Sequence, residues 1–327
     1  MPSFASGVTH TLFAVQEYLA PKASGRLAFW LFSRTPNPRR PSTREREALG
    51  RHAPFMEEAR LHRLRIKSGW IAAHVFKPGE DSSLVGPTGE VIANKREMPT
   101  ALVIHGWRSR SEHMVPVIMK MRAAGFRVVA LDLPGHGKSQ GRSLTMASAV
   151  EACAEAEKWF GPFKTIIGHS FGGAVAMSAT AGSVRRFAPL DTERLVLISA
   201  PNSMPAYFRW FASQLGLGKR TRAELENRVE SLTGAKLAEF IGVTQLSLTR
   251  IPTLVVHAQD DQEVSAENAR ALAGAGTHVA LQWIPDAGHR RILRDDMAHE
   301  AISEFVNRRG APWVAPLGLH KRPVEQA

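Results

Sequence analysis

The ten residues KTIIGHSFGG, from Lys164 to Gly173, decide the fold of this chain. An apolar strand leads into residues 168–172, which fit the pattern G-x-S-x-G, and the small residues after them suit a close-packed helix. A serine on such a sharp turn is exposed as a nucleophile, because the flanking glycines relieve the crowding around it. The pattern also occurs in ordinary glycine-rich turns, but its place between a strand and a helix favours Ser170 as a nucleophile.

Two later segments supply the partners that a serine nucleophile needs. A hydroxyl is a weak nucleophile at neutral pH, so it requires a histidine base and an acid that orients the base. The segment TLVVHAQDDQEV is typical of a buried strand that ends in paired carboxylates, Asp260 and Asp261. The segment IPDAGH ends another strand in a turn that carries His289. We therefore predict that Ser170, His289 and one of the two aspartates act together.

From residue 100 onward, short apolar runs alternate with longer helical patterns, as in buried parallel strands linked by crossover helices. The predicted strands are Ala101–Ile104, Val128–Leu131, Thr165–Ile167, Leu195–Ile198, Thr253–Val256 and Ala280–Ile284. The predicted helices lie near Glu112–Ala124, Met146–Trp159, Gly173–Ala181, Ala266–Gly274 and Asp296–Arg308. The sequence thus predicts an α/β fold with a doubly wound, mostly parallel sheet, where ligands bind beyond the carboxyl ends of the strands.

The rest of the chain divides around this core. The N-terminal region predicts a basic extension with one or two amphipathic helices, interrupted by the Pro/Arg-rich stretch TPNPRRPSTRERE. Alternating runs at Leu61–Lys67 and Trp70–Phe76 predict a hairpin. A later interval carries helical patterns without a convincing strand, which predicts a helical cap over the carboxyl edge of the sheet. The expected divisions are an extension of residues 1–60, a core of residues 61–200 and 251–310, a cap of residues 201–250 and a tail of residues 311–327.

Several motifs together resemble the α/β-hydrolase family over residues 61 to 308. His105, Gly106 and Trp107 follow a predicted strand and resemble the family's oxyanion loop. The segment DLPGHGKS, which begins at Asp132, resembles the family's D-x-P-G-H-G-x-S segment after the next strand. The order serine, aspartate, histidine along the chain is also the order found in this family.

The resemblance also distinguishes between the two aspartates. The family pattern H-G-x-x-D-x-x-V-P falls on HAQDDQEVS and places the catalytic acid at Asp261, one residue after Asp260. Ala258 and Ser265 depart from that pattern, so Asp260 remains the alternative partner of His289.

The resemblance implies a serine hydrolase that cleaves carboxylic esters through an acyl-enzyme intermediate. The backbone N–H groups of Trp107 and Phe171 would hold the oxyanion. Ser170 argues against the family's dehalogenases and epoxide hydrolases, whose nucleophile is an aspartate. A thioesterase, a cofactor-free perhydrolase and a catalytically weak ligand-binding relative would keep the same residues, so they remain alternatives.

The predicted cap is rich in apolar side chains, which would either pack as its own core or line an acyl pocket. The substrate-pocket candidates are His105, His169, Met204, Phe208 and Phe211. No H-E-x-x-H spacing or comparable ligand cluster occurs, and Cys153 is the only cysteine. We therefore expect neither a metal nor another cofactor.

The charge balance raises the question of a polyanionic partner. The 327 residues contain 42 Lys and Arg against 30 Asp and Glu, a formal net charge of +12. Residues 1–67 hold 12 of these cations and five Glu, a net charge of +7, so more than half of the excess is N-terminal. Weak peripheral association with an anionic membrane through this region is one interpretation. We favour the other, an arm packed on the body with solvated arginines.

The remaining partners and the location follow from what the sequence lacks. No nucleic-acid-binding motif or aromatic stacking platform accompanies the charge, so a nucleic-acid partner is not expected. No apolar run approaches the roughly 18 to 20 residues that span a bilayer, and the N-terminus lacks a signal-peptide pattern. We expect a cytoplasmic protein that acts on a small-molecule ester with an apolar acyl part, and we make no prediction of its oligomeric state.

Overall fold

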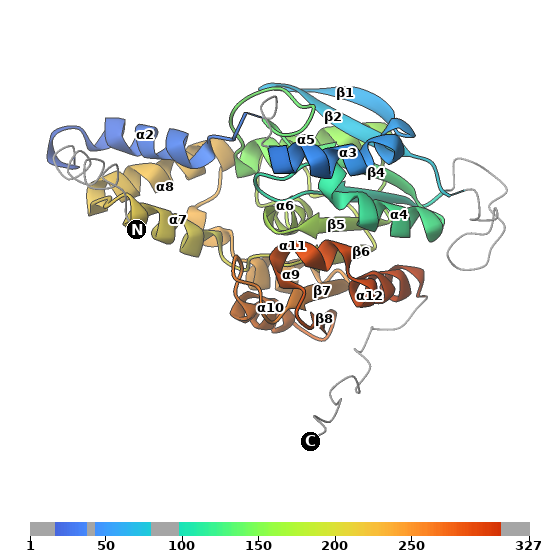
Figure 1. Ribbon diagram of the computed structural model, residues 1–327. Coiled ribbons are helices and arrows are strands. Elements are labelled where there is room, and N and C mark those ends of the chain that lie inside the picture. The colour runs from blue at the N-terminus through green and yellow to red at the C-terminus, as the bar shows by residue number, and fades with distance from the viewer. Residues whose placement is uncertain (1–16, 38–42, 80–97, 309–327) are drawn as a thin grey trace, which may run out of the picture.

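An eight-stranded sheet lies at the centre of the protein, with its strands in the order β1-β2-β4-β3-β5-β6-β7-β8 (Figure 1). The computed structural model describes residues 17–37, 43–79 and 98–308. The strands are β1 (Arg60–Ile66), β2 (Gly69–Phe76), β3 (Thr100–Ile104), β4 (Arg127–Asp132), β5 (Thr165–His169), β6 (Arg194–Ile198), β7 (Thr253–Ala258) and β8 (Val279–Ile284). β2 pairs antiparallel with β1 and β4, and the other neighbours are parallel. The predicted α/β fold with a doubly wound, mostly parallel sheet is confirmed.

The six strands predicted after residue 100 and the hairpin before them all occur. β3, β5 and β7 are buried along their whole length, as expected of apolar strands covered on both faces. β1 is an edge strand and mixes exposed with buried residues. Its hairpin to β2 closes with Ile66 opposite Gly69. Because the parallel strands run in one direction, the loops that follow them meet at one edge of the sheet.

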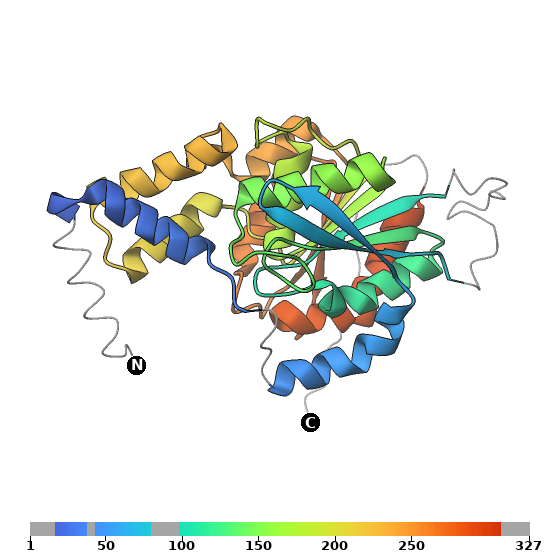
Figure 2. The same cartoon turned by 90° about the horizontal axis from the view of Figure 1, so that it is seen from above.

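Helices cover both faces of the sheet (Figures 1 and 2). One face packs a core that includes Leu102 and Val175, and the other packs a core around Phe126 and Phe305. In chain order the helices and single turns are α2 (Pro21–Ser33), α3 (Thr43–Glu57), η2 (Ser111–Met114), α4 (Val115–Ala123), α5 (Met146–Phe160), α6 (Phe171–Thr180), α7 (Met204–Gln214), α8 (Lys219–Thr233), η3 (Leu237–Glu239), α9 (Gly242–Thr249), α10 (Ala266–Ala273), α11 (Gly288–Arg291), η4 (Ile292–Arg294) and α12 (Asp296–Asn307).

Three of these helices, α2, α7 and α8, project together beyond the sheet (Figures 1 and 2). α2 comes from the N-terminal region and packs along α8, whereas α3 packs against α4 and η2. Residues 201–250 are described throughout and contain α7, η3, α8 and α9 but no strand of the sheet. α9 packs on α6 and α10 instead of joining the projection. The predicted tail, residues 311–327, lies outside the described residues.

A buried aspartate at the end of β4 forms hydrogen bonds to two loops at the carboxyl edge of the sheet. Asp132 ends β4 with no exposed surface, and its carboxylate accepts hydrogen bonds from the N–H groups of Ser111 at 2.9 Å and Lys138 at 2.8 Å. His74 Nε2 on β2 lies 3.0 Å from the same carboxylate. Burial alone would raise the pKa of Asp132, but the contact with His74 and the backbone hydrogen bonds hold that pKa well below its ordinary value.

We expect Asp132→Ala to lower the free energy of unfolding by about 3 to 5 kcal/mol, because it leaves a buried histidine and backbone donors without their acceptor. The matched control is Asp295→Ala, since Asp295 caps α12 through one hydrogen bond from the N–H of Ala298 at 3.1 Å. Loss of that cap costs about 1 kcal/mol. Urea unfolding measures both values, and equal losses would contradict the role given to Asp132.

Asp132 also makes the free energy of unfolding fall as the pH falls into the acid range. The pKa of Asp132 is lower in the folded chain than in the unfolded chain, so the unfolded chain binds its proton first as the pH falls. The stabilisation is therefore complete above about pH 4, the ordinary aspartate value, and is lost progressively below it. The free energy of unfolding should accordingly fall less between neutral and acid pH in the Asp132→Ala variant than in the native chain.

Candidate active site

Ser170 lies on a strained turn between β5 and α6. Its backbone φ is 54°, in the left-handed region that residues with a Cβ rarely adopt. The turn is held by two hydrogen bonds: the N–H of Ser170 donates to the carbonyl of Ile198 at 2.9 Å, and its own carbonyl accepts from the N–H of Gly173 at 2.9 Å. The side chain is half-buried. Its hydroxyl therefore stands at the carboxyl edge of the sheet.

Two glycines make this turn possible because other backbone passes close to them. A Cβ added to Gly168 would collide with the carbonyl oxygen of Gly172, one turn further on. A Cβ added to Gly172 would collide with the carbonyl oxygen of Ile104 at the end of β3. The two glycines of the G-x-S-x-G pattern are thus required by the packing of α6 against the sheet.

His289 and Asp261 meet at the same edge from two later loops. His289 lies in α11 after β8, and its Nδ1 is 2.8 Å from Asp261 Oδ2. The other carboxylate oxygen of Asp261 accepts hydrogen bonds from the N–H groups of Glu263 and Val264, both at 2.9 Å. Burial alone would raise the pKa of Asp261, but the bond from His289 and the backbone donors outweigh it and lower that pKa. The carboxylate is therefore ionised and fixed in orientation.

Asp260, the alternative acid, takes a different position. Its Oδ1 accepts a hydrogen bond from the N–H of Gly288 at 2.9 Å, and its Oδ2 lies 3.8 Å from Arg291 Nη2. Asp260 thus holds the backbone just before His289, whereas Asp261 contacts the imidazole ring itself. The side chain that the sequence pattern selected, Asp261, is the one on the histidine nitrogen.

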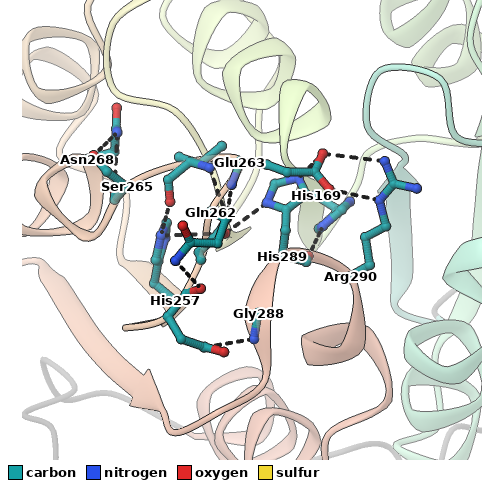
Figure 3. A network of polar contacts seen from close by, with 12 residues as sticks. His169, His257, Gln262, Glu263, Ser265, Asn268, Gly288, His289 and Arg290 are labelled. Atoms are coloured by element: carbon teal, nitrogen blue, oxygen red, sulfur yellow. Dashed lines mark hydrogen bonds and ion pairs between the residues drawn. The ribbon is translucent and has the colours of Figure 1, made fainter. Parts of the chain in front are cut away.

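The opposite nitrogen of His289 lies near the carboxylate of Glu263. Its Nε2 is 4.0 Å from Glu263 Oε2, and the same carboxylate pairs with Arg290 at 3.0 and 3.4 Å (Figure 3). Within the described residues, Ser170 Oγ makes no hydrogen bond to this nitrogen. Contacts between a nucleophile and its base are often loose without substrate and tighten in the substrate complex.

Two backbone donors lie beside Ser170. A Cβ on Gly106 would lie 2.9 Å from Ser170 Cβ, so the loop after β3 passes directly against the serine. Within the described part of the chain, the N–H groups of Trp107 and Phe171 have no acceptor. The two rings pack edge to face, with centroids 5.7 Å apart. The predicted oxyanion donors therefore flank the serine on two adjoining loops.

Two buried histidines hold the first of these loops in place. His105 accepts a hydrogen bond from the N–H of Leu133 at 3.0 Å, and its other ring nitrogen donates to the carbonyl of Gly106 at 2.7 Å. His136 accepts from the N–H of Arg108 at 3.1 Å, which fixes a residue whose φ is 54°. Burial lowers the pKa of His105 to about 3 and also lowers that of His136, so both rings stay neutral and can accept.

His169 connects the serine turn to the loop of His289. Its ring is buried, and Nε2 donates to the carbonyl oxygen of His289 at 2.9 Å (Figure 3). Its Nδ1 lies beside Gly106, where a Cβ would come within 3.2 Å of it. Burial, together with the nearby His289, lowers the pKa of His169 to about 3, so the ring is neutral. One side chain of the serine turn thus contacts two other loops of the site.

An aromatic cluster adjoins the candidate oxyanion donors. Phe208 of α7 is buried, Phe211 is half-buried, and both contact Phe32 of α2, with ring centroids 4.2 and 5.0 Å from it. The ring of Phe32 also lies 6.4 Å from that of Trp107. Met204, the remaining pocket candidate of the cap, is buried at the first turn of α7. Phe208 and Phe211, two pocket candidates of the predicted cap, therefore gather with a residue from the N-terminal region.

Phe32 and Tyr207 are the residues at this site that sequence reasoning missed. Phe32 comes from a segment 138 positions before Ser170 in a helix that no motif connects to the site. Tyr207 donates from its hydroxyl to the carbonyl of Glu263 at 3.4 Å, and burial together with Asp261 and Glu263 raises its pKa to about 12. The aromatic residues of both segments indicated buried helix faces, but the sequence did not show that these faces lie at the site.

No cluster of metal-ligating side chains accompanies these residues. Among the described residues, no group of three or more His, Cys, Asp or Glu side chains could hold a metal ion.

Comparisons with known proteins agree on the fold. A family model described as "Alpha/beta hydrolase family" matches residues 101–304. A search of the curated proteins found no match. Among solved structures, the esterase domain of a Rhodothermus marinus protein is 22% identical and matches with a TM-score of 0.50 over 76% of this chain and 96% of that one. An esterase from Exiguobacterium antarcticum is 15% identical, with a TM-score of 0.52 over 75% and 99%.

A third structure, titled a membrane phospholipase A and a bacterial virulence factor, is 17% identical to this chain. It matches with a TM-score of 0.54 over 80% of this chain and 91% of that one. At these identities the likeness shows a shared fold.

Proposed function

The chain belongs to the alpha/beta hydrolase family, and we propose that it cleaves carboxylic esters with Ser170 as nucleophile, His289 as base and Asp261 as the orienting acid. One observation carries the proposal: His289 Nδ1 lies 2.8 Å from Asp261, while Ser170 stands on a positive-φ turn at the same edge of the sheet. Esterases among the structural neighbours agree with this chemistry.

The proposed reaction proceeds in two stages. His289 Nε2 takes the proton of Ser170 as Oγ attacks the ester carbonyl, and Asp261 stabilises the imidazolium through Nδ1–H. The tetrahedral intermediate collapses to an acyl-enzyme when His289 returns the proton to the leaving alcohol. Water then attacks the acyl group with His289 as base, which releases the acid and restores Ser170.

The N–H groups of Trp107 and Phe171 are proposed to bind the negative oxygen of each tetrahedral intermediate. They are preorganised because His105 and His136 fix the first loop and the packing of α6 fixes the second. Donors of this kind stabilise the transition state by about 3 to 4 kcal/mol each, since they need no reorganisation during the reaction.

The acyl part of the substrate is proposed to be apolar, because Phe32, Phe208 and Phe211 adjoin the candidate donors. We expect Phe32→Ala to raise KM for long-chain esters about tenfold or more through lost apolar contact, with a smaller effect on acetate esters. Phe32→Leu should restore much of the affinity. Equal changes for short and long acyl groups would contradict an acyl-binding role for Phe32.

His169 is proposed as a positioning residue that acts through His289. His169→Ala removes the donor to the carbonyl of His289, and we expect kcat to fall about tenfold to a hundredfold with KM nearly unchanged, because the base is displaced from Ser170. His169→Gln keeps an N–H near that carbonyl and should recover part of kcat. A fall in stability without a change in kcat would show that the contact is only structural.

A fluorophosphonate probe and a panel of esters of increasing acyl length test the proposed function. The native chain should be labelled at Ser170 and should hydrolyse at least one ester. If it neither labels nor turns over any ester, the hydrolase proposal fails. Thioesters and peracid formation, assayed beside the esters, separate the thioesterase and perhydrolase alternatives, and labelling without turnover would favour the ligand-binding alternative.

The cellular location and the partners of the protein are also part of the proposal. We propose a cytoplasmic enzyme for small-molecule esters whose contact with membranes, where it occurs, is peripheral and involves the basic N-terminal region. Among the described residues, no helix is both long enough and apolar enough to cross a membrane.

A further inference from the structure

Helix α2 exposes several large apolar residues to solvent, whereas its Phe29 and Phe32 pack against the protein core. Ser24, Gly25 and Ala28 are its buried positions against α8. Gly25 is needed there because a Cβ would lie 2.5 Å from Glu224 Cβ. The exposed positions form one outer face of α2, which contains Lys22, Ala23, Arg26, Leu27, Trp30 and Leu31 and is extended by Arg34 just after the helix. An amphipathic helix that only packs on the protein core buries its large apolar side chains and exposes its polar ones.

The exposure of this outer face is substantial and contiguous. Trp30 is 48% exposed, and Leu27 and Leu31 are each 38% exposed. Leu27 and Leu31 are four residues apart and Trp30 lies beside Leu31, so they adjoin on one side of the helix. Single exposed apolar residues are normal on a protein surface, whereas a continuous apolar strip marks a place of contact.

The cations of the outer face are available for a partner. Lys22, Arg26 and Arg34 form no ion pair with any residue in the described ranges, and the sequence of α2 contains no Asp or Glu. The Arg34 guanidinium lies 4.4 Å from the centre of the Trp30 ring. The face therefore combines apolar side chains with positive charge and a tryptophan.

Both ends of α2 are anchored, so the face is already formed. Just before the helix, the Glu17 carboxylate accepts hydrogen bonds from the N–H groups of Arg220 at 2.6 Å and Thr221 at 3.0 Å at the start of α8. At its last residue, the carbonyl of Ser33 accepts from the N–H of Leu144 at 2.8 Å, and just after it the N–H of Thr35 donates to the carbonyl of Arg142 at 3.1 Å. A partner would thus meet an ordered helix and would not have to fold it.

We propose that the outer face of α2 docks on an anionic lipid surface. Leucine and tryptophan side chains enter the boundary between headgroups and acyl chains, while lysine and arginine contact the phosphates. A second copy of this chain fits less well, because a two-fold contact through this face would bring the three cations of one copy against those of the other. Nucleic acid would leave the leucines without a partner.

Docking on lipid does not require hydrolase activity, but it would place the membrane close to the proposed active site. Phe32 follows Leu31 but points to the other side of α2, into the aromatic cluster beside Trp107. A lipid surface on the outer face would therefore lie one helix diameter, about 10 Å, from that cluster. Apolar esters dissolved in the membrane would be presented next to the proposed acyl-binding side.

Co-sedimentation of the full chain with vesicles tests the proposal. We expect binding to vesicles that contain phosphatidylserine, little binding to phosphatidylcholine alone, and weaker binding as salt is raised. Lys22→Gln with Arg26→Gln should lower partitioning about fivefold for each charge. Leu27→Gln with Leu31→Gln should lower it about tenfold or more.

The matched controls change the same residue types elsewhere. Arg65→Gln with Lys67→Gln, the β1 variant, removes two exposed cations of the same basic N-terminal region, one on β1 and one just after it. Leu248→Gln removes a leucine of α9 that is 74% exposed. Neither control should alter partitioning beyond about twofold, within the scatter expected of surface substitutions. Hydrolysis of a water-soluble ester, unchanged in every variant, shows that the site is intact.

Several results would overturn the docking proposal. Equal binding to neutral vesicles, wild-type binding by both α2 variants, or an equal loss in the β1 variant would each exclude this face as an anionic-lipid site. A dimer in solution that dissociates in the Leu27→Gln, Leu31→Gln variant would assign the face to a second copy. Loss of ester hydrolysis with intact vesicle binding would instead contradict the proposed function alone.

Discussion

Ser170→Ala is expected to lower kcat for ester hydrolysis by about a millionfold while leaving the fold intact. The hydroxyl is the only group of the proposed site that forms a bond to substrate, and loss of the nucleophile in a Ser-His-Asp system removes nearly all of the covalent pathway. Some rate above that in water should remain, because the donors at Trp107 and Phe171 still bind the carbonyl oxygen. Single-turnover assays and fluorophosphonate labelling measure the loss.

Ser199 provides a closely matched control for this variant. It follows β6, the strand next to β5, and has a φ of 47° where Ser170 has 54°. Its side chain is fully buried, whereas that of Ser170 is half-buried. Ser199→Ala should therefore keep kcat within a few-fold of the native value. If Ser170→Ala still formed the fluorophosphonate adduct, the nucleophile would have to be another residue.

The strands and the serine turn were predictable because local sequence determines them. A buried parallel strand requires a continuous apolar run, and β3, β5 and β7 are such runs. The G-x-S-x-G turn was predictable for the same reason, since Gly168 and Gly172 are the residue type that the close backbone approach permits. The order of these elements then placed Ser170, Asp261 and His289 at one edge of the sheet.

The contribution of α2 was not predictable from the sequence. Its apolar residues indicated an amphipathic helix, and the favoured interpretation was an arm packed on the body. In the structure α2 packs on α8 through Ser24, Gly25 and Ala28, because their small side chains allow a close crossing of the two helices. This crossing involves residues about 200 positions apart in the chain, and no local pattern encodes such a contact. The side of α2 that carries Phe32 could be assigned only from that packing.

The two neighbouring aspartates give the second large prediction. Asp261→Asn is expected to lower kcat by about ten-thousandfold, whereas Asp260→Asn should keep kcat within a few-fold of the native value. An amide at position 261 can turn its NH₂ group toward His289 Nδ1, which then acts as acceptor and leaves the proton on Nε2. A ring protonated on Nε2 cannot take the proton of Ser170. At position 260 the amide oxygen still accepts from the N–H of Gly288, so the loop is kept.

The comparison of the two variants also distinguishes the effect of orienting His289 from the effect of a nearby negative charge on kcat. The two substitutions each remove one negative charge close to His289, so an effect of charge alone would lower kcat to a similar extent in both variants. The pKa of Asp261 lies below its ordinary value, so in the native chain its carboxylate is ionised throughout the range above about pH 4. Measurement of kcat for both variants across that range should show the larger loss in Asp261→Asn at every pH. A larger loss in Asp260→Asn would assign the orienting acid to Asp260 and would place the hydrogen bond of Asp261 outside the reaction.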